Sequence, residues 1–65
     1  MMTIKEVVDT FSADLPDWQY GVNLAWLTNL HSLMAEGGVW ASPELGTIYQ
    51  KKGAGFVLVE PPKEA

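Results

Sequence analysis

The first residues of the chain have the hydrophobic spacing of a short amphipathic helix. Their apolar positions recur at i, i+3, i+4 and i+7, one stripe of a 3.6-residue period: Ile4, Val7, Val8 and Phe11. Thr3 and Glu6 have the spacing of a capping box, in which the threonine hydroxyl accepts from the Glu6 amide and the glutamate reaches back. Because Pro16 disfavours helical geometry at the residue before it, we expect this helix to begin at Ile4 and to end near residues 13–14.

A second and longer helix is predicted over residues 18–36, with a proline before its start and Gly37-Gly38 as its stop. One sector of about 120° on a helical wheel gathers its apolar side chains, Trp26, Leu27, Leu30, Leu33 and Met34. We expect this sector to be buried. Gly21 disfavours the helix by about 1 kcal/mol relative to alanine, so Val22 is an alternative point at which the regular helix begins.

Beyond Gly38 the hydrophobic period changes to two, and turn residues follow at regular spacing. This pattern predicts three antiparallel strands, at residues 39–42, 47–52 and 56–60. A loop of residues 43–46 is expected to join the first two strands, and a tight turn at Gly53-Ala54 to join the last two.

The fold class is therefore predicted to be α+β, with two N-terminal helices packed on a three-stranded antiparallel β-sheet in the order ααβββ. Residues 1–60 are expected to form a single small α+β domain, because no linker or internal repeat divides them. Pro61-Pro62 cannot continue a strand ladder, so residues 61–65 are predicted to form a flexible C-terminal tail.

The turn lengths fix which strand residues lie opposite one another, and they sort the sheet into two apolar faces. The predicted pairs are Ala41 with Ile48, Trp40 with Tyr49, Tyr49 with Leu58, and Ile48 with Val59. One face carries Trp40, Tyr49, Phe56 and Leu58, and the other carries Val39, Ala41, Ile48, Gln50, Val57 and Val59. We expect the second, β-branched face to pack on the helices and the aromatic face to remain open. In the alternative arrangement, Trp40 and Phe56 supply the bulk of a small core.

Composition narrows the class of protein. The 65 residues carry eight Asp and Glu against four Lys and Arg, a net charge of −4, with no cysteine and 48% hydrophobic residues. The lack of cysteine excludes disulfides, iron–sulfur clusters and thiol catalysis. No apolar segment approaches the ~18 residues of a membrane span, and the first residues lack the pattern of a signal peptide. We therefore expect a cytoplasmic protein with no membrane attachment.

Side chains that often carry chemistry are sparse in this sequence. His31 is the single histidine and falls at the boundary between the apolar and polar sectors of the second helix. No serine lies in a Gly-x-Ser-x-Gly turn, and Asp14 and Asp17 offer too few oxygen ligands for calcium. Residues 51–55 lack the third glycine and the Lys-Ser/Thr pair of phosphate-binding loops. We therefore predict no enzymatic activity, no metal site and no cofactor.

The function that best fits these features is a noncatalytic protein–protein interaction module. An open patch of Trp40, Tyr49, Phe56 and Leu58 would reach or exceed the roughly 300–600 Å² of the largest apolar patch on a typical monomer. We therefore expect this face to bind a protein partner, most simply a second copy of the chain, which would make a homodimer.

The alternative function is a small nucleic-acid-binding regulator. Two helices followed by a hairpin with Lys51 and Lys52 at its tip have the layout, though not the motifs, of a truncated winged helix. The acidic helical half and the lack of arginine weigh against this alternative, because phosphates and bases are bound mainly by basic side chains.

Overall fold

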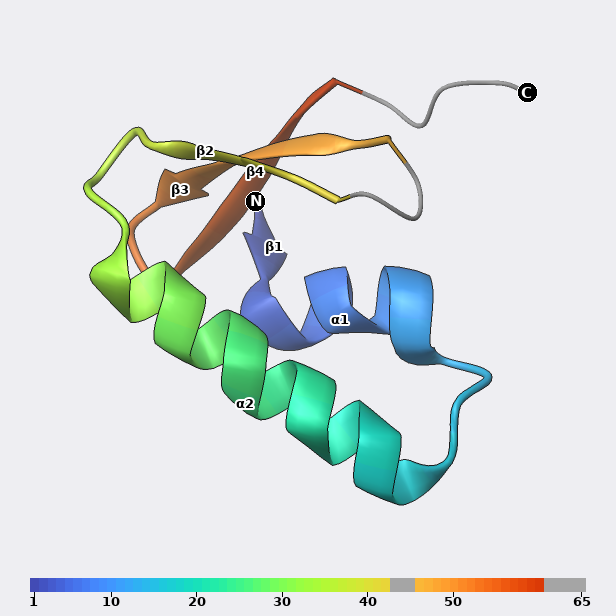
Figure 1. Ribbon diagram of the computed structural model, residues 1–65. Helices are drawn as coiled ribbons and strands as arrows, with labels where there is room; N and C mark the ends of the chain where they lie inside the picture. Colours follow the sequence, from blue (N-terminus) through green and yellow to red (C-terminus); the bar gives the residue numbers. More distant parts are fainter. Residues whose placement is uncertain (43–45, 61–65) are drawn as a thin grey trace.

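The computed structural model describes residues 1–42 and 46–60, which form two helices packed on one side of an antiparallel sheet (Figure 1). The elements in chain order are β1 (Met2–Thr3), α1 (Ile4–Ser12), α2 (Asp17–Leu33), β2 (Val39–Ala41), β3 (Ile48–Lys52) and β4 (Gly55–Glu60). The strand order across the sheet is β1-β4-β3-β2. The predicted α+β class is confirmed, and the sheet has one additional strand of two residues at its edge. The predicted tail at 61–65 and residues 43–45 of the predicted loop lie outside the described residues.

The start of α1 is closed by the predicted capping box. The Glu6 amide donates to the Thr3 hydroxyl at 3.1 Å, and the Thr3 amide donates to the Glu6 carboxylate at 2.9 Å. A helix start leaves four amides without partners inside the helix, and a capping box provides side-chain acceptors for two of them. The helix begins at Ile4, as predicted, and ends at Ser12, slightly earlier than the predicted end near residues 13–14. Val7 and Val8 are fully buried and anchor it to the core.

The second helix differs from its prediction at both ends. It begins at Asp17, so Gly21 does not delay its start, and it ends at Leu33 rather than at residue 36. The last turn of α2 contacts the sheet at this end. The Lys51 ammonium donates to the carbonyl oxygens of His31 and Met34, both at 2.8 Å. A cation at this position satisfies carbonyls that the last turn leaves unpaired, and Met34 itself is extended.

The buried side of α2 is also rotated from the predicted sector. Leu27 and His31 are buried, whereas Trp26 and Leu33, which the helical wheel placed in the buried sector, are exposed. The prediction for these two residues is wrong because apolar side chains cover much more of the circumference of α2 than the sheet and α1 can contact. His31 is likewise in the core, not at a boundary.

The register of the sheet is largely as predicted. Trp40 pairs with Tyr49, Ala41 with Ile48, and Tyr49 with Leu58. Ile48 pairs with Glu60 and not with Val59, because a bulge shifts the register between Ile48 and Tyr49. The hairpin between β3 and β4 turns at Gly53, whose φ of 55° lies in the left-handed region that glycine adopts without strain.

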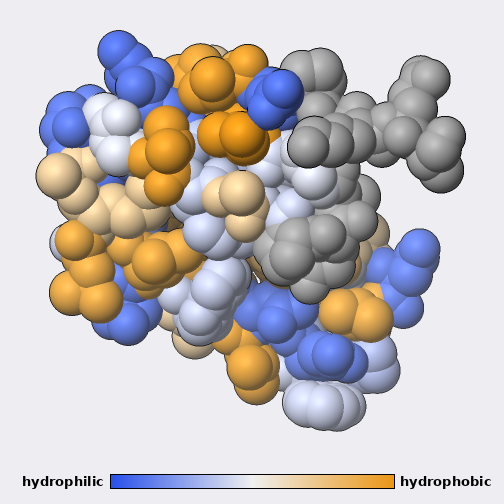
Figure 2. All heavy atoms as spheres, turned by 45° about the horizontal axis from the view of Figure 1, so that its top comes forward, coloured by the Kyte–Doolittle hydropathy of each residue, from blue (hydrophilic) through white to orange (hydrophobic). Residues whose placement is uncertain are grey.

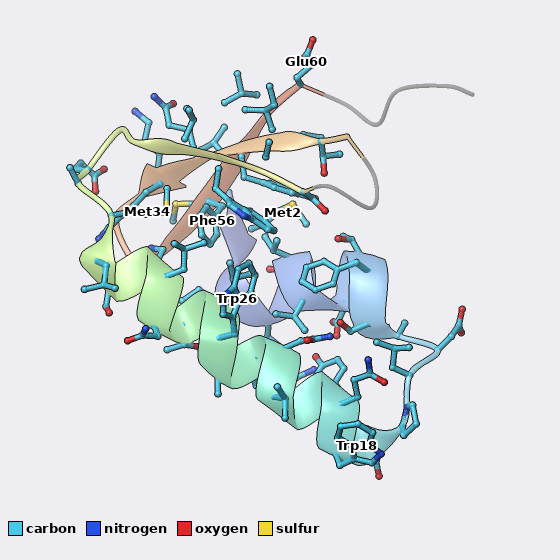
Figure 3. The ribbon with its side chains drawn as sticks, in the orientation of Figure 1. Met2, Trp18, Trp26, Met34, Phe56 and Glu60 are labelled. Atoms are coloured by element: carbon cyan, nitrogen blue, oxygen red, sulfur yellow. The ribbon has the colours of Figure 1, made fainter. Side chains whose placement is uncertain are left out.

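The face of the sheet that meets the helices is the aromatic one, so the predicted orientation of the sheet is wrong. Tyr49 is 2% exposed and Phe56 is fully buried. The Trp40 ring stacks on Tyr49 at a centroid distance of 5.7 Å, and Tyr49 meets Phe56 edge-on at 6.1 Å. These large rings fill the space between sheet and helices, which short β-branched side chains would leave unpacked. In Figure 3, Phe56, Met2 and Met34 lie between the two layers.

Candidate functional site

The predicted partner-binding residues come together, but most of them are inside the molecule. Trp40, Tyr49 and Phe56 form one cluster of rings with centroids 5.7 to 6.4 Å apart. Trp40 is half-buried, while Tyr49 and Phe56 belong to the core with Val7, Val8 and Leu27. Leu58 is exposed. The aromatic cluster therefore holds the helices on the sheet and does not form an open face for a partner.

The opposite side of the sheet is an apolar surface that the helices leave uncovered. This outer sheet face consists of Val39, Ala41, Ile48, Gln50 and Val57, with Val59 beside them at the bulge. Val39 is 63% and Val59 is 54% exposed. Within residues 1–42 and 46–60, both helices lie on the other side of the sheet (Figure 1). Figure 2 shows apolar side chains gathered over the strands, with hydrophilic ones around them.

This outer sheet face differs from the usual open side of an antiparallel sheet. An antiparallel sheet with one solvated side normally alternates apolar residues toward the core with polar residues toward water. Here Gln50 is the single polar member among the six residues of the face. Charges stand at its two ends, since Lys52 ends β3 next to the hairpin and Glu60 ends β4 at the opposite end. The face therefore combines an uncharged apolar centre with one cation and one anion at its limits.

A second apolar surface lies between the two helices. A cleft of about 630 Å³ opens there, lined by Phe11, Leu15, Gln19, Val22, Asn23, Trp26 and Trp40. Trp26 rises from α2 to meet Trp40 edge-on at 5.7 Å, and Phe11 on α1 meets Trp40 at 6.3 Å (Figure 3). Asn23 donates to the Ser12 hydroxyl at 2.8 Å, which ties the two helices together at the floor of the cleft. Apart from Gln19 and Asn23, all the lining residues are apolar or aromatic.

Residue spacing alone did not predict this interhelical cleft, although the sequence contains a signal for it. Trp18 and Val22 are apolar residues of α2 that fall outside the sector expected to be buried. Their exposure to solvent was not inferred, because the cleft depends on how α1 docks against α2. That docking angle comes from side-chain packing between helices and has no direct signature in one sequence.

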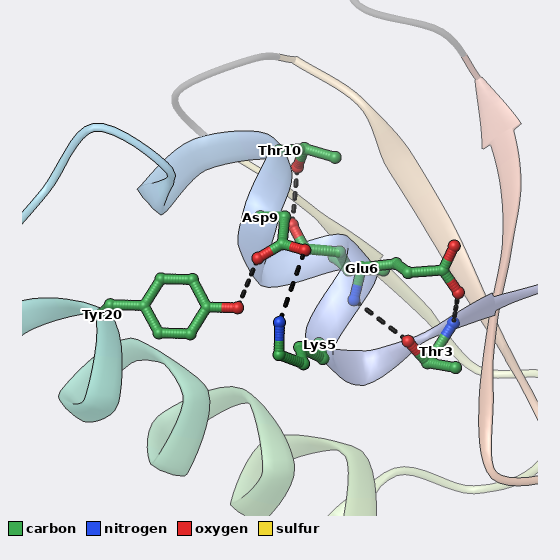
Figure 4. Close-up of polar contacts among 7 residues, drawn as sticks. Thr3, Lys5, Glu6, Asp9, Thr10 and Tyr20 are labelled. Atoms are coloured by element: carbon green, nitrogen blue, oxygen red, sulfur yellow. Dashed lines mark hydrogen bonds and ion pairs between the residues drawn. The ribbon is translucent and has the colours of Figure 1, made fainter. Parts of the chain in front are cut away.

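On the other side of the helix pair, a polar cluster links α1 to α2 (Figure 4). The Tyr20 hydroxyl donates to the Asp9 carboxylate, and the Lys5 ammonium lies 3.9 Å from the same group. The hydrogen bond to Asp9 raises the pKa of Tyr20. The Tyr20 hydroxyl and then the Asp9 charge raise the pKa of Lys5. Both pKa values move away from neutrality, so neither group is prepared to exchange a proton near pH 7.

The remaining candidate residues have structural partners. The His31 Nε2 atom lies 3.1 Å from the Gly55 carbonyl oxygen, and its ring meets Phe56 edge-on at 5.1 Å. Lys51 is engaged at the end of α2, which leaves Lys52 as the exposed lysine of the predicted nucleic-acid site. Nucleic-acid binding at the hairpin tip stays a prediction; within residues 1–42 and 46–60, Lys52 is exposed at this tip and Lys51 is bound to the end of α2.

Residues 1–42 and 46–60 contain neither a membrane-spanning helix nor a metal-binding cluster. No helix there combines the length and the apolar character needed to cross a lipid bilayer. In the same residues, no three side chains of His, Asp or Glu converge in an arrangement that would hold a metal ion. No protein-family model matches the chain, and neither do curated proteins or solved structures.

Proposed function

We propose that this protein is a noncatalytic protein–protein interaction module that self-associates through its outer sheet face. The observation that carries the proposal is that the sheet is apolar on both sides while the helices cover one of them. Exposed apolar surface of this kind usually marks an interaction site. Two such sheets would pack about 10 Å apart, as in other face-to-face sheet pairs.

A second copy of the chain is the partner that best matches the charges of the face. In such a dimer, a twofold axis lies between the two facing sheets and runs perpendicular to their strands. The strands of the second copy then run in the opposite direction to those of the first. Lys52 of one copy then approaches Glu60 of the other, and the pair occurs twice by symmetry. The uncharged centre, with Ile48 and Val57, would meet itself without burying an unpaired charge.

The small size of the core supports the same partner. Among the described residues, the apolar side chains that are fully or almost fully buried are Val7, Val8, Leu27, Tyr49 and Phe56. A single core in a chain of this length rarely supplies more than about 3–5 kcal/mol of stability. Covering the outer sheet face in a dimer would add apolar burial to each chain, and fully burying one Val or Ile side chain contributes about 1.5–3 kcal/mol.

The test is a pair of variants that add the same charge at different places. Val57→Glu puts a carboxylate at the centre of the outer sheet face, where a dimer would have to desolvate it without a cation. Ala54→Glu adds a carboxylate to the exposed hairpin turn, away from the face. Light scattering coupled to gel filtration is expected to give a dimer for the wild type and for Ala54→Glu, and a folded monomer for Val57→Glu.

Two outcomes would contradict self-association through this face. One is a wild-type chain that remains monomeric up to roughly millimolar concentration, which corresponds to less than about 4 kcal/mol of association free energy. The other is a Val57→Glu variant that dimerises as tightly as the wild type, which would mean that copies meet elsewhere. Circular dichroism of each variant checks that the fold is retained.

A further inference from the structure

The exposed side of α2 carries a row of apolar side chains that Asn29 interrupts. We name Trp18, Val22, Trp26 and Leu33 the α2 stripe; their exposed fractions are 71%, 58%, 49% and 76%. They lie at i, i+4, i+8 and i+15, which follows one side of an α-helix. At 100° per residue the four span about 80° of the helix circumference. The stripe therefore runs along the length of the helix, and the interhelical cleft adjoins it at Val22 and Trp26.

The α2 stripe lies beside the side of α2 that contacts the core, and it reaches the sheet at one residue, Trp26, which meets Trp40. Leu27, Leu24 and His31 face α1 and the sheet. Leu27, at the middle of that side, is about 140° around the helix from Val22. The same helix thus has one apolar side facing inward and a second facing solvent, where Figure 3 shows Trp18 at the helix start, far from the sheet.

We propose that the α2 stripe and the interhelical cleft together bind an amphipathic helix of a partner protein, one that carries basic residues. The apolar residues of such a helix would lie at i, i+3, i+4 and i+7 and pack against the stripe as ridges into grooves. From Trp18 to Leu33 the stripe runs for about 22 Å at 1.5 Å per residue, the length of roughly four helical turns. The cleft would receive one large anchor from the partner, between Leu15 and Trp26.

The charge of the partner helix is inferred from the charges around the site. Asp14 and Asp17 are exposed and stand within two residues of Leu15, at the end of the cleft where α1 turns into α2. No lysine or arginine occurs between residues 6 and 50. The nearest cation in sequence, Lys5, lies beside Asp9 on the other side of the helix pair. A partner with lysine or arginine near this end would meet two carboxylates that form no ion pair with the residues that the structure describes.

A parallel pairing with a second copy of this chain is disfavoured at the same site, because Asp17 would face Asp17. In an antiparallel pairing about Trp26, Asp14 and Asp17 of one copy would approach the end of α2 in the other, where Glu36 stands near Lys51. The Lys51 ammonium is already held there by the carbonyl oxygens of His31 and Met34, which favours a partner that brings its own cations.

The experiment uses a synthetic peptide as the probe. An 18-residue amphipathic helix of leucine and lysine, labelled with fluorescein, is titrated with the protein, and its anisotropy is followed. A matched peptide of leucine and glutamate has the same apolar face and the opposite charge. The leucine–lysine peptide is expected to bind with an affinity that falls as salt rises, and the leucine–glutamate peptide is expected not to bind.

Matched variants locate the binding site. Val22→Ser with Leu33→Ser removes two exposed members of the α2 stripe, and it is expected to weaken binding about tenfold or more. Val39→Ser with Val59→Ser makes a similar change on the outer sheet face, and it is expected to leave the affinity within about twofold. Equal losses in both double variants, or equal binding of both peptides, would overturn the proposal.

A charge reversal provides a second test that does not depend on removing apolar contacts. Asp14→Lys is expected to weaken binding of the leucine–lysine peptide several-fold, whereas Glu60→Lys, the same charge change on the sheet, is expected to have little effect. If the two reversals act equally, the peptide responds to net charge alone and the site is wrong. The Val57→Glu variant is expected to bind the peptide normally, so this proposal and self-association can fail independently.

Discussion

The two helices of this small domain are related to the core in different ways. α1 has nine residues, buries one side through Val7 and Val8, and begins with a capping box. α2 has 17 residues, begins after Pro16 with no side-chain cap, and is apolar on two sides. A helix with one apolar side is fully accommodated by its own chain, whereas a helix that is apolar most of the way round requires further burial. The difference indicates that α1 serves the fold, and it is the reason for our proposal that α2 also binds a partner.

The largest effect expected from this comparison is a contrast between two leucines of α2. Leu27→Ala leaves a cavity in the core and is expected to cost about 2–5 kcal/mol of unfolding free energy. Leu33→Ala removes a side chain that is mostly in water and is expected to change stability by less than about 0.5 kcal/mol. Urea unfolding followed by circular dichroism measures both. Similar losses for the two variants would show that the α2 stripe is buried in the isolated chain.

The difference between α1 and α2 also explains which parts of the fold could be predicted from the sequence. Hydrophobic period, the capping pair and the prolines were sufficient for α1, for the three longer strands and for most of the register. They also predicted that α2 exists, but not which side of it is buried, because period alone does not decide which of two neighbouring apolar sides faces the sheet. The bulge at Val59 also has no local signature in residues 56–60.

The candidate surfaces were predicted only in part. Both faces of the sheet were recognised as apolar, but the choice between them depends on the depth of the space under the helices, which the rings of Tyr49 and Phe56 fill. The cleft beside Trp26 requires the angle between α1 and α2, so it could not be located from residue spacing. Tertiary packing, and not the local pattern, determined each of these features.

A medium effect is expected at the helix start that has a cap. Thr3→Ala removes the hydroxyl that accepts from the Glu6 amide and is expected to cost about 0.5–2 kcal/mol. Thr3→Ser keeps the acceptor and is the matched control, expected to lie close to the wild type. If Thr3→Ala leaves the urea midpoint unchanged, the cap does not stabilise α1, and the two helix starts do not differ in this respect.

The capping box also predicts how stability depends on pH. The hydrogen bond from the Thr3 amide lowers the pKa of Glu6 in the folded state. The ionised carboxylate therefore stabilises the fold above the unfolded pKa of about 4.3, and this contribution is lost as the pH falls through the lower folded value. Glu6→Gln is expected to be less sensitive to acid over that window. Equal acid sensitivity of Glu6→Gln and the wild type, in urea midpoints measured from about pH 6 to pH 3, would contradict the assigned role of Glu6.

The smallest expected effect is a gain in stability at the uncapped helix. Gly21 is exposed within α2, and a methyl group added there would meet nothing within 4 Å. Gly21→Ala is therefore expected to raise the unfolding free energy by about 0.4–1 kcal/mol, because alanine has fewer unfolded conformations to lose. Gly37→Ala is the opposing control, since the φ of 84° at Gly37 is unfavourable for alanine and predicts a loss. If Gly21→Ala instead lowers stability, the first turns of α2 depart from regular helix, and the α2 stripe would lose its alignment at Trp18 and Val22.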